Sequence, residues 1–286
     1  MATTPAQRHL GPTAIGVDLG ATWVRVVLAR PDGRLVRIAP RRAIVTFDLA
    51  KFLLELRRRR ATSGAPLRAV VVASRGVWTS AERRRLARRL RGVAPRVEIV
   101  PDVKAALLGA LGERAGVLIL AGTGSIVLGR DARGRWARAG GLGPLLGDAG
   151  SGFWLGAEWL RQTSTRGRFT RARRLVQSRN AVASIAALAP VVIRRARRGD
   201  PRARAIVRYG QDALARLAVD VARRLALRAP VAVSWAGSVM GDAWFRRGVR
   251  RALERTGVAA RWSEPRDEPV VAAARLAARL ARRHRR

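Results

Sequence analysis

The chain has 286 residues, 48% of them hydrophobic, so it is long and apolar enough to bury a large core and is not disordered. It has no cysteine and only two histidines, which excludes disulfides, thiolate metal sites and cysteine nucleophiles and leaves catalysis to carboxylates, hydroxyls, backbone amides and arginine. The formal net charge of +39 comes mainly from arginines spread through most of the predicted helices, which favours solvated helix faces over a nucleic-acid surface.

Strands alternate with helices through the first part of the chain. Apolar runs predict strands at 14–19, 24–29, 34–38, 67–74 and 96–100. Apolar residues at helical spacing predict helices at 48–60, 80–91 and 103–111. Ser80 is the expected N-cap of the second of these helices. This alternation predicts an α/β sheet.

The opening pattern recurs near residue 116. A shift of 102 residues lays "IGVDLGATWVRVVL" on "VLILAGTGSIVLGR" and places Gly20 on Gly122 and Thr22 on Gly124. Each copy predicts a strand, a short Gly-rich turn and a second strand. This recurrence indicates two equivalent halves that face each other. The alternative is a chance resemblance between two hairpins.

The second half of the chain is mostly helical. We expect helices between about 151 and 228, a strand at 231–237, a helix at 241–257 and a last helix at about 268–284. No apolar run approaches the ~20 residues that a membrane helix needs, and no secretory signal opens the sequence. We therefore expect a cytoplasmic protein without a membrane partner.

Three acidic residues stand apart from the others, most of which lie in polar turns or on arginine-rich helices. Asp18 ends an apolar strand before a Gly-rich turn, Asp102 follows the strand "VEIV", and Asp148 lies among glycines. In open α/β sheets, groups at the carboxyl ends of strands line the ligand crevice. These aspartates are therefore candidate functional residues, with helix or turn capping as the alternative for each.

The two Gly-rich turns are suited to phosphate. Gly20-Ala21-Thr22 and Gly122-Thr123-Gly124-Ser125 allow close approach of the backbone to an anion, and their amides and hydroxyls donate hydrogen bonds. Asp18, beside the first turn, is suited to hold Mg²⁺ through water. Facing each other, the two turns would grip a polyphosphate from both sides.

The stretch from 139 to 160, "AGGLGPLLGDAGSGFWLGAEWL", contains no arginine, although 56 of the 286 residues are arginine. An arginine there would fill a pocket or pair with Asp148. The stretch is therefore a candidate substrate site.

Seven motifs in order resemble one family. They are "IGVDLGAT", "IVPDVKAALLGAL", "LILAGTGSIVLGR", "AGGLGPLLGDAGSGFWLG", "GDPRARAIV", "VSWAGSVMGD" and "DEPVVAAARLA". They are similar to those of the BadF/BadG/BcrA/BcrD-type ATPases and the N-acetylglucosamine kinases, of the sugar kinase, heat-shock protein and actin superfamily. The resemblance runs from residue 14 to 280.

The resemblance implies an α/β fold of two RNase H-like (actin-like ATPase) domains around an ATP cleft. The N-terminal domain would comprise 1–104, with the helix at about 268–284 packed back on it. The C-terminal domain would comprise 105–267, with a helical insertion at about 151–228.

The resemblance also implies roles for individual residues. Asp18 would serve Mg²⁺, and Asp102 would be the general base that accepts a proton from the substrate hydroxyl. The residues implied at the ATP phosphates are Gly20, Ala21, Thr22, Gly122, Thr123, Gly124 and Ser125. Those implied near the adenosine are Ala236, Gly237 and Ser238, and those implied at the substrate are Gly141, Leu142, Gly143 and Asp148.

The leading hypothesis is an ATP-dependent kinase acting on a hydroxyl of a small sugar-like molecule. A second hypothesis is an ATP-hydrolysing activator of a protein partner, as some members of the family are; without cysteine, only a cluster-free version remains. A third is a nucleic-acid binder with an actin-like fold. The sequence leaves a homodimer open.

Overall fold

The structure is a computed structural model that describes residues 13–20, 23–43, 47–61, 66–164 and 169–283. The chain divides into two compact units. Unit 1 comprises Met1–Gly109 and Asp267–Arg286, and unit 2 comprises Ala110–Arg266. Each unit contains one five-stranded sheet with helices, so the predicted α/β class is confirmed.

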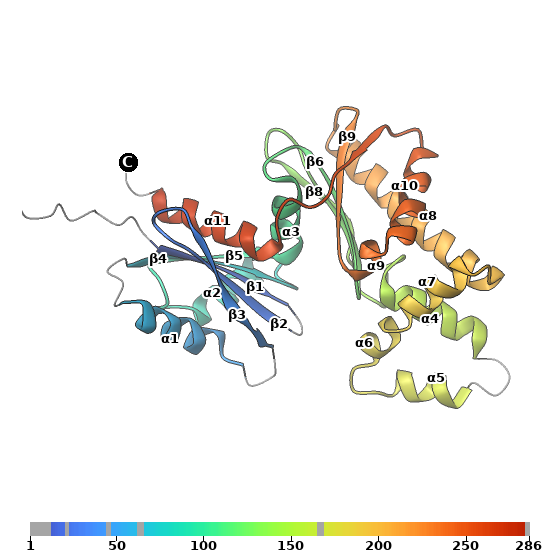
Figure 1. Cartoon of the computed structure of the whole chain (residues 1–286), viewed down its shortest axis with the longest axis horizontal. Helices are drawn as coiled ribbons and strands as arrows, with labels where there is room; N and C mark the ends of the chain where they lie inside the picture. The colour runs from blue at the N-terminus through green and yellow to red at the C-terminus, as the bar shows by residue number, and fades with distance from the viewer. Residues whose placement is uncertain (1–12, 21–22, 44–46, 62–65, 165–168, 284–286) are drawn as a thin grey trace, which may run out of the picture. The chain divides into compact units, whose positions relative to one another are not determined.

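Unit 1 is built on a mixed sheet in the order β3-β2-β1-β4-β5 (Figure 1). Its strands are β1 (Thr13–Leu19), β2 (Trp23–Ala29), β3 (Leu35–Arg42), β4 (Leu67–Ser74) and β5 (Arg96–Pro101). Its helices are α1 (Leu49–Ala61), α2 (Ser80–Arg89), α3 (Asp102–Leu111, whose last two residues fall in unit 2) and α11 (Pro269–Arg282). Strands β1, β4 and β5 run parallel, so their carboxyl ends meet at one edge of the sheet.

The two faces of this sheet follow the period-2 alternation of β1. Ala14 belongs to the core beneath α11, whereas Ile15 and Val17 belong to the core that includes α1. Gly16 also faces α11: a Cβ there would lie 2.0 Å from the backbone nitrogen of Ala274. A glycine is therefore required where the last helix of the chain packs directly on the first strand.

Unit 2 repeats this topology with a sheet in the order β10-β9-β6-β7-β8. Its strands are β6 (Gly116–Ala121), β7 (Ser125–Arg130), β8 (Trp136–Gly140), β9 (Val231–Ala236) and β10 (Ala260–Trp262). Its helices are α4 (Gly152–Thr163), α5 (Phe169–Val176), α6 (Ala181–Ala186), α7 (Ala189–Arg197), α8 (Pro201–Arg224), α9 (Ser238–Gly241) and α10 (Ala243–Glu254). Strand by strand, β6 to β10 correspond to β1 to β5.

The core of unit 2 lies between the sheet and helices α4, α7, α8 and α10. Val117, Ile119 and Ala121 alternate along β6 toward this core, where they meet fully buried side chains such as Leu214 of α8 and Phe245 of α10. Burial of several such side chains, at about 1.5–3 kcal/mol each, accounts for much of the stability of the unit. No helix in the described part of the chain is long and apolar enough to cross a membrane.

Several local predictions differ from the structure. Thr79, not Ser80, caps α2: its hydroxyl accepts from the Glu82 amide at 3.2 Å, and the Glu82 carboxylate accepts from the Thr79 amide at 2.6 Å. This reciprocal capping box uses a glutamate three residues after the cap, which places the cap at 79. Strands β8 and β10 were not predicted, and the helical middle is divided into five separate helices.

Candidate functional site

Asp18 lies at the carboxyl end of β1, directly opposite Arg25 of β2. The Arg25 guanidinium donates a hydrogen bond to the Asp18 carboxylate at 3.3 Å, and the aspartate side chain is only 14% exposed. Burial raises the pKa of Asp18 above its ordinary value, although Arg25 acts in the opposite direction. The charges of Asp102 and Glu268 raise this pKa further.

Asp102 is the first residue of α3 and directly follows β5. Its carboxylate accepts a hydrogen bond from the Val103 amide at 2.8 Å. Burial raises the pKa of Asp102, against the lowering effects of the Val103 amide and of the Arg75 charge. Because β1 and β5 end at the same edge of the sheet, unit 1 brings Asp18 and Asp102 to one edge, as the sequence predicts.

The Gly-rich turn of unit 2 joins β6 to β7 and is held from several sides. The Gly122 amide donates to the Gly124 carbonyl at 2.9 Å across the turn. The first amides of α4, from Gly152 and Phe153, donate to the carbonyls of Gly122 and Thr123 at 2.7 and 3.1 Å. These bonds fix the turn against the start of α4, which belongs to the arginine-free stretch.

Asp148 lies against this same turn. It adopts a left-handed backbone conformation with a φ of 63° and is 7% exposed. A Cβ on Gly124 would lie 2.7 Å from an Asp148 carboxylate oxygen, so the glycine makes room for the aspartate. The Ser125 hydroxyl donates to the Ala149 carbonyl at 3.0 Å, which ties the two segments together. The structure therefore brings Asp148 to the predicted phosphate turn.

The turn predicted near the adenosine also meets the phosphate turn. Gly237 follows β9 with a φ of 89°, and a Cβ there would lie 2.4 Å from the Ala121 carbonyl oxygen. A Cβ on Gly122 would lie 3.7 Å from the amide nitrogen of Ser238. Thus unit 2 gathers residues 122–125, 148 and 236–238 at the carboxyl ends of β6 and β9.

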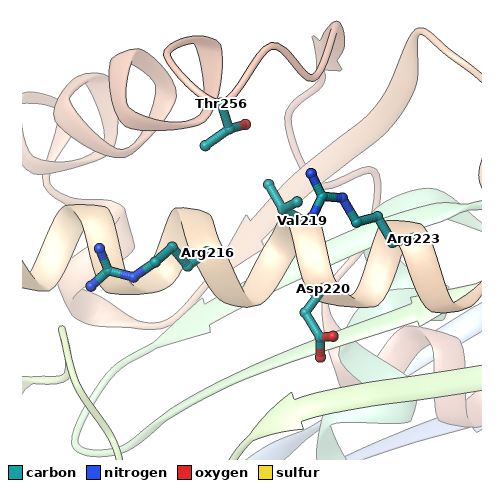
Figure 2. Close-up of a pocket in the computed structure, with 5 residues that line it drawn as sticks. All are labelled: Arg216, Val219, Asp220, Arg223 and Thr256. Carbon is teal, nitrogen blue, oxygen red and sulfur yellow. The ribbon is translucent and has the colours of Figure 1, made fainter.

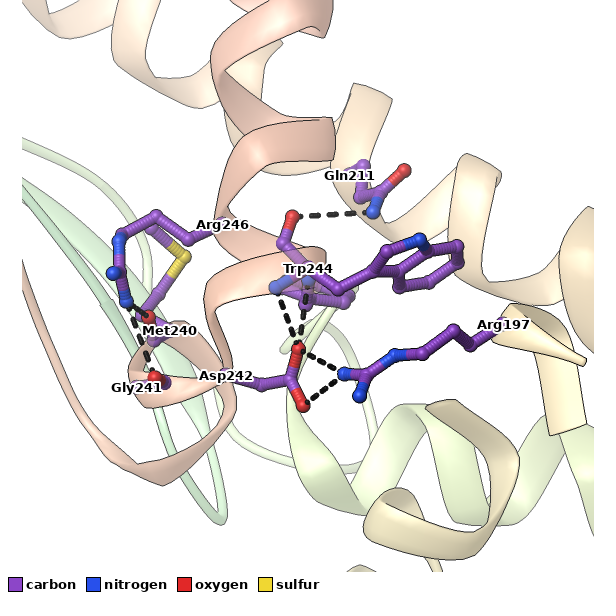
Figure 3. A network of polar contacts seen from close by, with 8 residues as sticks. Arg197, Gln211, Met240, Gly241, Asp242, Trp244 and Arg246 are labelled. Atoms are coloured by element: carbon purple, nitrogen blue, oxygen red, sulfur yellow. Dashed lines mark hydrogen bonds and ion pairs between the residues drawn. The ribbon is translucent and has the colours of Figure 1, made fainter. Parts of the chain in front are cut away.

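A polar network holds the segment that follows Ser238 (Figure 3). Asp242 caps α10 by accepting from the amides of Trp244 and Phe245, both at 2.9 Å, and pairs with Arg197 of α7 at 2.9 Å. The Arg246 guanidinium donates to the carbonyls of Met240 and Gly241, at 2.8 and 3.2 Å. The network fixes short helix α9 between β9 and α10 and so positions the turn at Gly237.

The remaining predicted residues lie less close together. The Gly141 amide donates to the Ser125 carbonyl at 3.1 Å, beside the phosphate turn. Leu142 is 65% exposed, and no atom lies within 4 Å of a Cβ built on Gly143. In unit 1, the Gly20 amide donates to the Trp23 carbonyl at 3.0 Å. Ala21 and Thr22 lie outside the described residues.

Asp18 is the candidate residue for holding Mg²⁺. No group of three or more acidic or histidine side chains in the described ranges could hold a metal ion. Asp18 nevertheless fits, since Mg²⁺ is usually held by one or two carboxylates together with substrate phosphates. Sequence reasoning missed Arg25, the ion-pair partner of Asp18; its place opposite Asp18 follows only from the hairpin register.

Two curated proteins resemble short stretches of the chain. An N-acetylmuramic acid/N-acetylglucosamine kinase of Clostridium acetobutylicum is 40% identical over 70 residues, which cover 24% of this chain and 23% of that protein. An N-acetyl-D-glucosamine kinase of Dictyostelium discoideum is 51% identical over 53 residues, which cover 18% of this chain and 17% of that protein. The matched stretches therefore span less than a quarter of the length of either relative.

The fold and the family follow from longer matches. A Chromobacterium violaceum protein assigned as an N-acetylglucosamine kinase has a solved structure with a TM-score of 0.66 and 26% identity, covering 93% of this chain and 99% of that one. This likeness confirms the expected actin-like ATPase fold. The model of the BadF/BadG/BcrA/BcrD ATPase family matches residues 15–277. The chain therefore belongs to the BadF/BadG/BcrA/BcrD ATPase family.

Proposed function

We propose that the chain is an ATP-dependent kinase that phosphorylates a hydroxyl of a small sugar or amino sugar, such as N-acetylglucosamine or glucosamine. The observation that carries the proposal is Asp102, a partly buried carboxyl with a raised pKa at the edge of the sheet where Asp18 also lies. Buried carboxyls with raised pKa values serve as general bases. The names of the curated relatives support a sugar acceptor.

In the proposed reaction, the hydroxyl oxygen of the acceptor forms a bond to the γ-phosphorus of ATP, and Asp102 accepts the proton of that hydroxyl. The bond from that phosphorus to the bridging oxygen breaks, and ADP leaves with the electron pair. Asp18 would hold Mg²⁺ together with the phosphates, and the ion supplies positive charge that offsets theirs. The protein contributes mainly orientation and electrostatic stabilisation, as in other phosphoryl transfers.

Unit 2 would bind the nucleotide. Residues 122–125 would receive the phosphates, and Ala236, Gly237 and Ser238 would lie near the adenosine. Asp148 would bind the substrate or shape its pocket; its contact with Gly124 supports the second of these roles. The enzyme would act in the cytoplasm on a small molecule, without a nucleic-acid or membrane partner, and light scattering would test for a homodimer.

The first experiment measures ADP release with Mg-ATP and a panel of acceptors: N-acetylglucosamine, glucosamine, N-acetylmuramic acid and glucose. We expect saturable, acceptor-dependent ADP release with one of the amino sugars. ADP release that is unchanged by every sugar and is stimulated by a protein partner would instead indicate an ATPase switch.

The variant Asp102→Asn tests the general base. Loss of a general base costs about 10²–10⁴-fold in rate, so we expect kcat to fall by this factor while ATP still binds. Glu98→Gln, an exposed change on β5, the strand that precedes Asp102, is the matched control and should retain activity. Phosphoryl transfer retained by Asp102→Asn would overturn this assignment.

A further inference from the structure

Unit 2 contains a pocket of about 630 Å³ that the proposed reaction does not use. Four separate segments form its walls: the residues before β6, the turn between β7 and β8, the connection from α8 to β9, and strand β10. Its charged lining residues are Arg114, Asp131, Arg133, Arg135, Arg228 and Arg261. We call it the arginine pocket, since five arginines and one aspartate from these segments line it.

The arginine pocket lies at the amino ends of β6 and β9. Gly116 and Val231, the first residues of these strands, belong to its lining, whereas the phosphate turn begins at Gly122 after the last residue of β6. Six strand residues at ~3.3 Å each separate the two places by about 17–20 Å. A ligand in the arginine pocket would therefore not occupy the candidate phosphate turn.

Two of the five arginines are held in place by hydrogen bonds. Asp131 is buried, and its carboxylate accepts from the backbone amide of Arg135 at 2.8 Å and from its Nε at 2.6 Å. The Nε of Arg114 donates to the Leu111 carbonyl at 3.2 Å. Both side chains are bonded through Nε, so their terminal guanidinium nitrogens remain for a ligand.

The other three arginines have no counter-ion among the described residues. The side chains of Arg133, Arg228 and Arg261 form no hydrogen bond or ion pair with another residue in the described part of the chain. Some other arginines of unit 2 are paired, such as Arg255 with Asp212 at 2.7 Å. Asp131 is already paired with Arg135. Like charges in one pocket repel one another, and a bound anion would relieve that repulsion.

Helix α8 ends at the pocket and slightly opposes an anion there. A helix C-terminus carries about half of one negative elementary charge. The positive charge of five guanidinium groups is larger than the negative charge of Asp131 and of the helix end taken together. The net field of the pocket therefore favours a ligand with several negative charges.

A second pocket does not bring arginines together from several segments (Figure 2). It has a volume of about 350 Å³ and is lined by Arg216, Val219, Asp220, Arg223 and Thr256. Both of its arginines come from α8 alone, and an acidic residue accompanies them. Abundant arginine in the chain therefore does not by itself place arginines from several segments in one pocket.

We propose that the arginine pocket binds a small metabolite carrying at least two phosphate groups. Guanidinium groups recognise phosphate oxygens in a bidentate manner, and arginines on several walls require more than one such group. A volume of about 630 Å³ suits a small-molecule ligand. The pocket is separate from the phosphate turn, so this proposal does not depend on whether the acceptor is a sugar.

The test is calorimetric titration of the full chain at about 0.15 M salt, an ionic strength that screens exposed charges beyond ~8 Å. Excess Mg²⁺ and a non-hydrolysable ATP analogue are present to occupy the nucleotide site. The probes are fructose 1,6-bisphosphate, adenosine 3′,5′-bisphosphate and fructose 6-phosphate. We expect saturable binding of one equivalent of a bisphosphate, with the monophosphate about tenfold weaker because it makes fewer charge-assisted bonds. The tighter of the two bisphosphates identifies a sugar or a nucleoside as the carrier.

The variant Arg133→Gln/Arg228→Gln/Arg261→Gln should bind the bisphosphate at least about tenfold more weakly than the wild type. The matched control, Arg208→Gln/Arg216→Gln/Arg223→Gln, removes the same amount of charge from α8. It should lower the affinity for the bisphosphate by less than about threefold. Melting temperatures confirm that both variants fold.

Three results would overturn the proposal. The first is the absence of saturable binding of either bisphosphate, and the second is equal weakening by both triple variants, which would indicate diffuse charge. The third is binding of a DNA duplex that depends on the pocket arginines while the bisphosphates do not bind, which would indicate a nucleic-acid surface. Failure of the kinase assay would leave the titration unaffected, so the two proposals fail separately.

Discussion

The hairpins β1–β2 and β6–β7 occupy the same place in their sheets but carry different chemistry. Where unit 1 has the ion pair of Asp18 and Arg25, the shift of 102 residues places Leu120 and Val127 in unit 2. The register also differs by one residue: Leu19 pairs with Val24, whereas Ala121 pairs with Ser125. The second turn is therefore one residue shorter than the aligned glycines indicate.

One topology supplies two kinds of group in the two units. Unit 1 presents carboxylates at the ends of its parallel strands. Unit 2 presents a glycine turn, and the acid that lies against it, Asp148, comes from a separate segment. The two sheets thus share a topology while the residues at their strand ends differ. Three variants or measurements sharpen this comparison.

The largest effect is expected from Gly16→Ala. The aligned residue of unit 2 is the fully buried Leu118, but in unit 1 a Cβ would lie 2.0 Å from the Ala274 nitrogen. Overpacking against backbone should lower the free energy of unfolding of unit 1 by about 3 kcal/mol or more. Hydrogen exchange should show faster exchange in β1, β4 and α11 with unit 2 still protected. Wild-type protection in unit 1 would contradict the packing described here.

A smaller effect is expected from Gly124→Ala in the phosphate turn. The new Cβ would lie 2.7 Å from an Asp148 oxygen, so either the turn or the aspartate must move. A displaced turn should weaken ATP binding about tenfold or more, since such sites depend on positions within about 0.5 Å. Gly241→Ala is the control, because no atom lies within 4 Å of its Cβ. Equal ATP affinity in both variants would argue against phosphate binding at this turn.

The smallest effect is expected in the pH dependence that Asp18 and Asp102 of unit 1 produce. Burial holds the pKa values of Asp18 and Asp102 above the ordinary 3.8. If Asp102 acts as a base, kcat/KM should rise with pH through this raised pKa, above the range of an ordinary aspartate. The two carboxyls affect stability in the opposite direction from activity. Their raised pKa values stabilise the fold below the unfolded-state pKa, and this stabilisation is lost as pH rises through the folded-state pKa.

The double variant Asp18→Asn/Asp102→Asn should therefore raise the melting temperature of unit 1 at pH 7. The difference from wild type should shrink as the pH falls through the raised pKa values. Glu55→Gln, an exposed change on α1, serves as the control and should leave the pH dependence unchanged. A variant less stable than wild type at pH 7 would show that ion pairs, not burial, dominate at these carboxyls.

Strong apolar periodicity made most of the fold predictable from the sequence. The predicted strand at 67–74 matches β4, and the candidate acids at 18 and 102 fall at strand ends as expected. Strands β8 and β10 were missed because they are edge strands, defined by pairing with β7 and β9 rather than by their own short sequences. The contact of Asp148 with Gly124 also escaped prediction, because it depends on a left-handed residue and on tertiary packing.

The close contact of α11 with β1 has a consequence for biosynthesis. The first strand of the chain reaches its packing partner only when the last helix, Pro269–Arg282, has been made. Unit 2 is continuous in sequence and has all its residues before that point. Since domains fold as units during synthesis, unit 2 can begin to assemble its core before α11 has been made, whereas unit 1 cannot complete its core until then. Unit 1, which contains β1, thus completes its core later than unit 2.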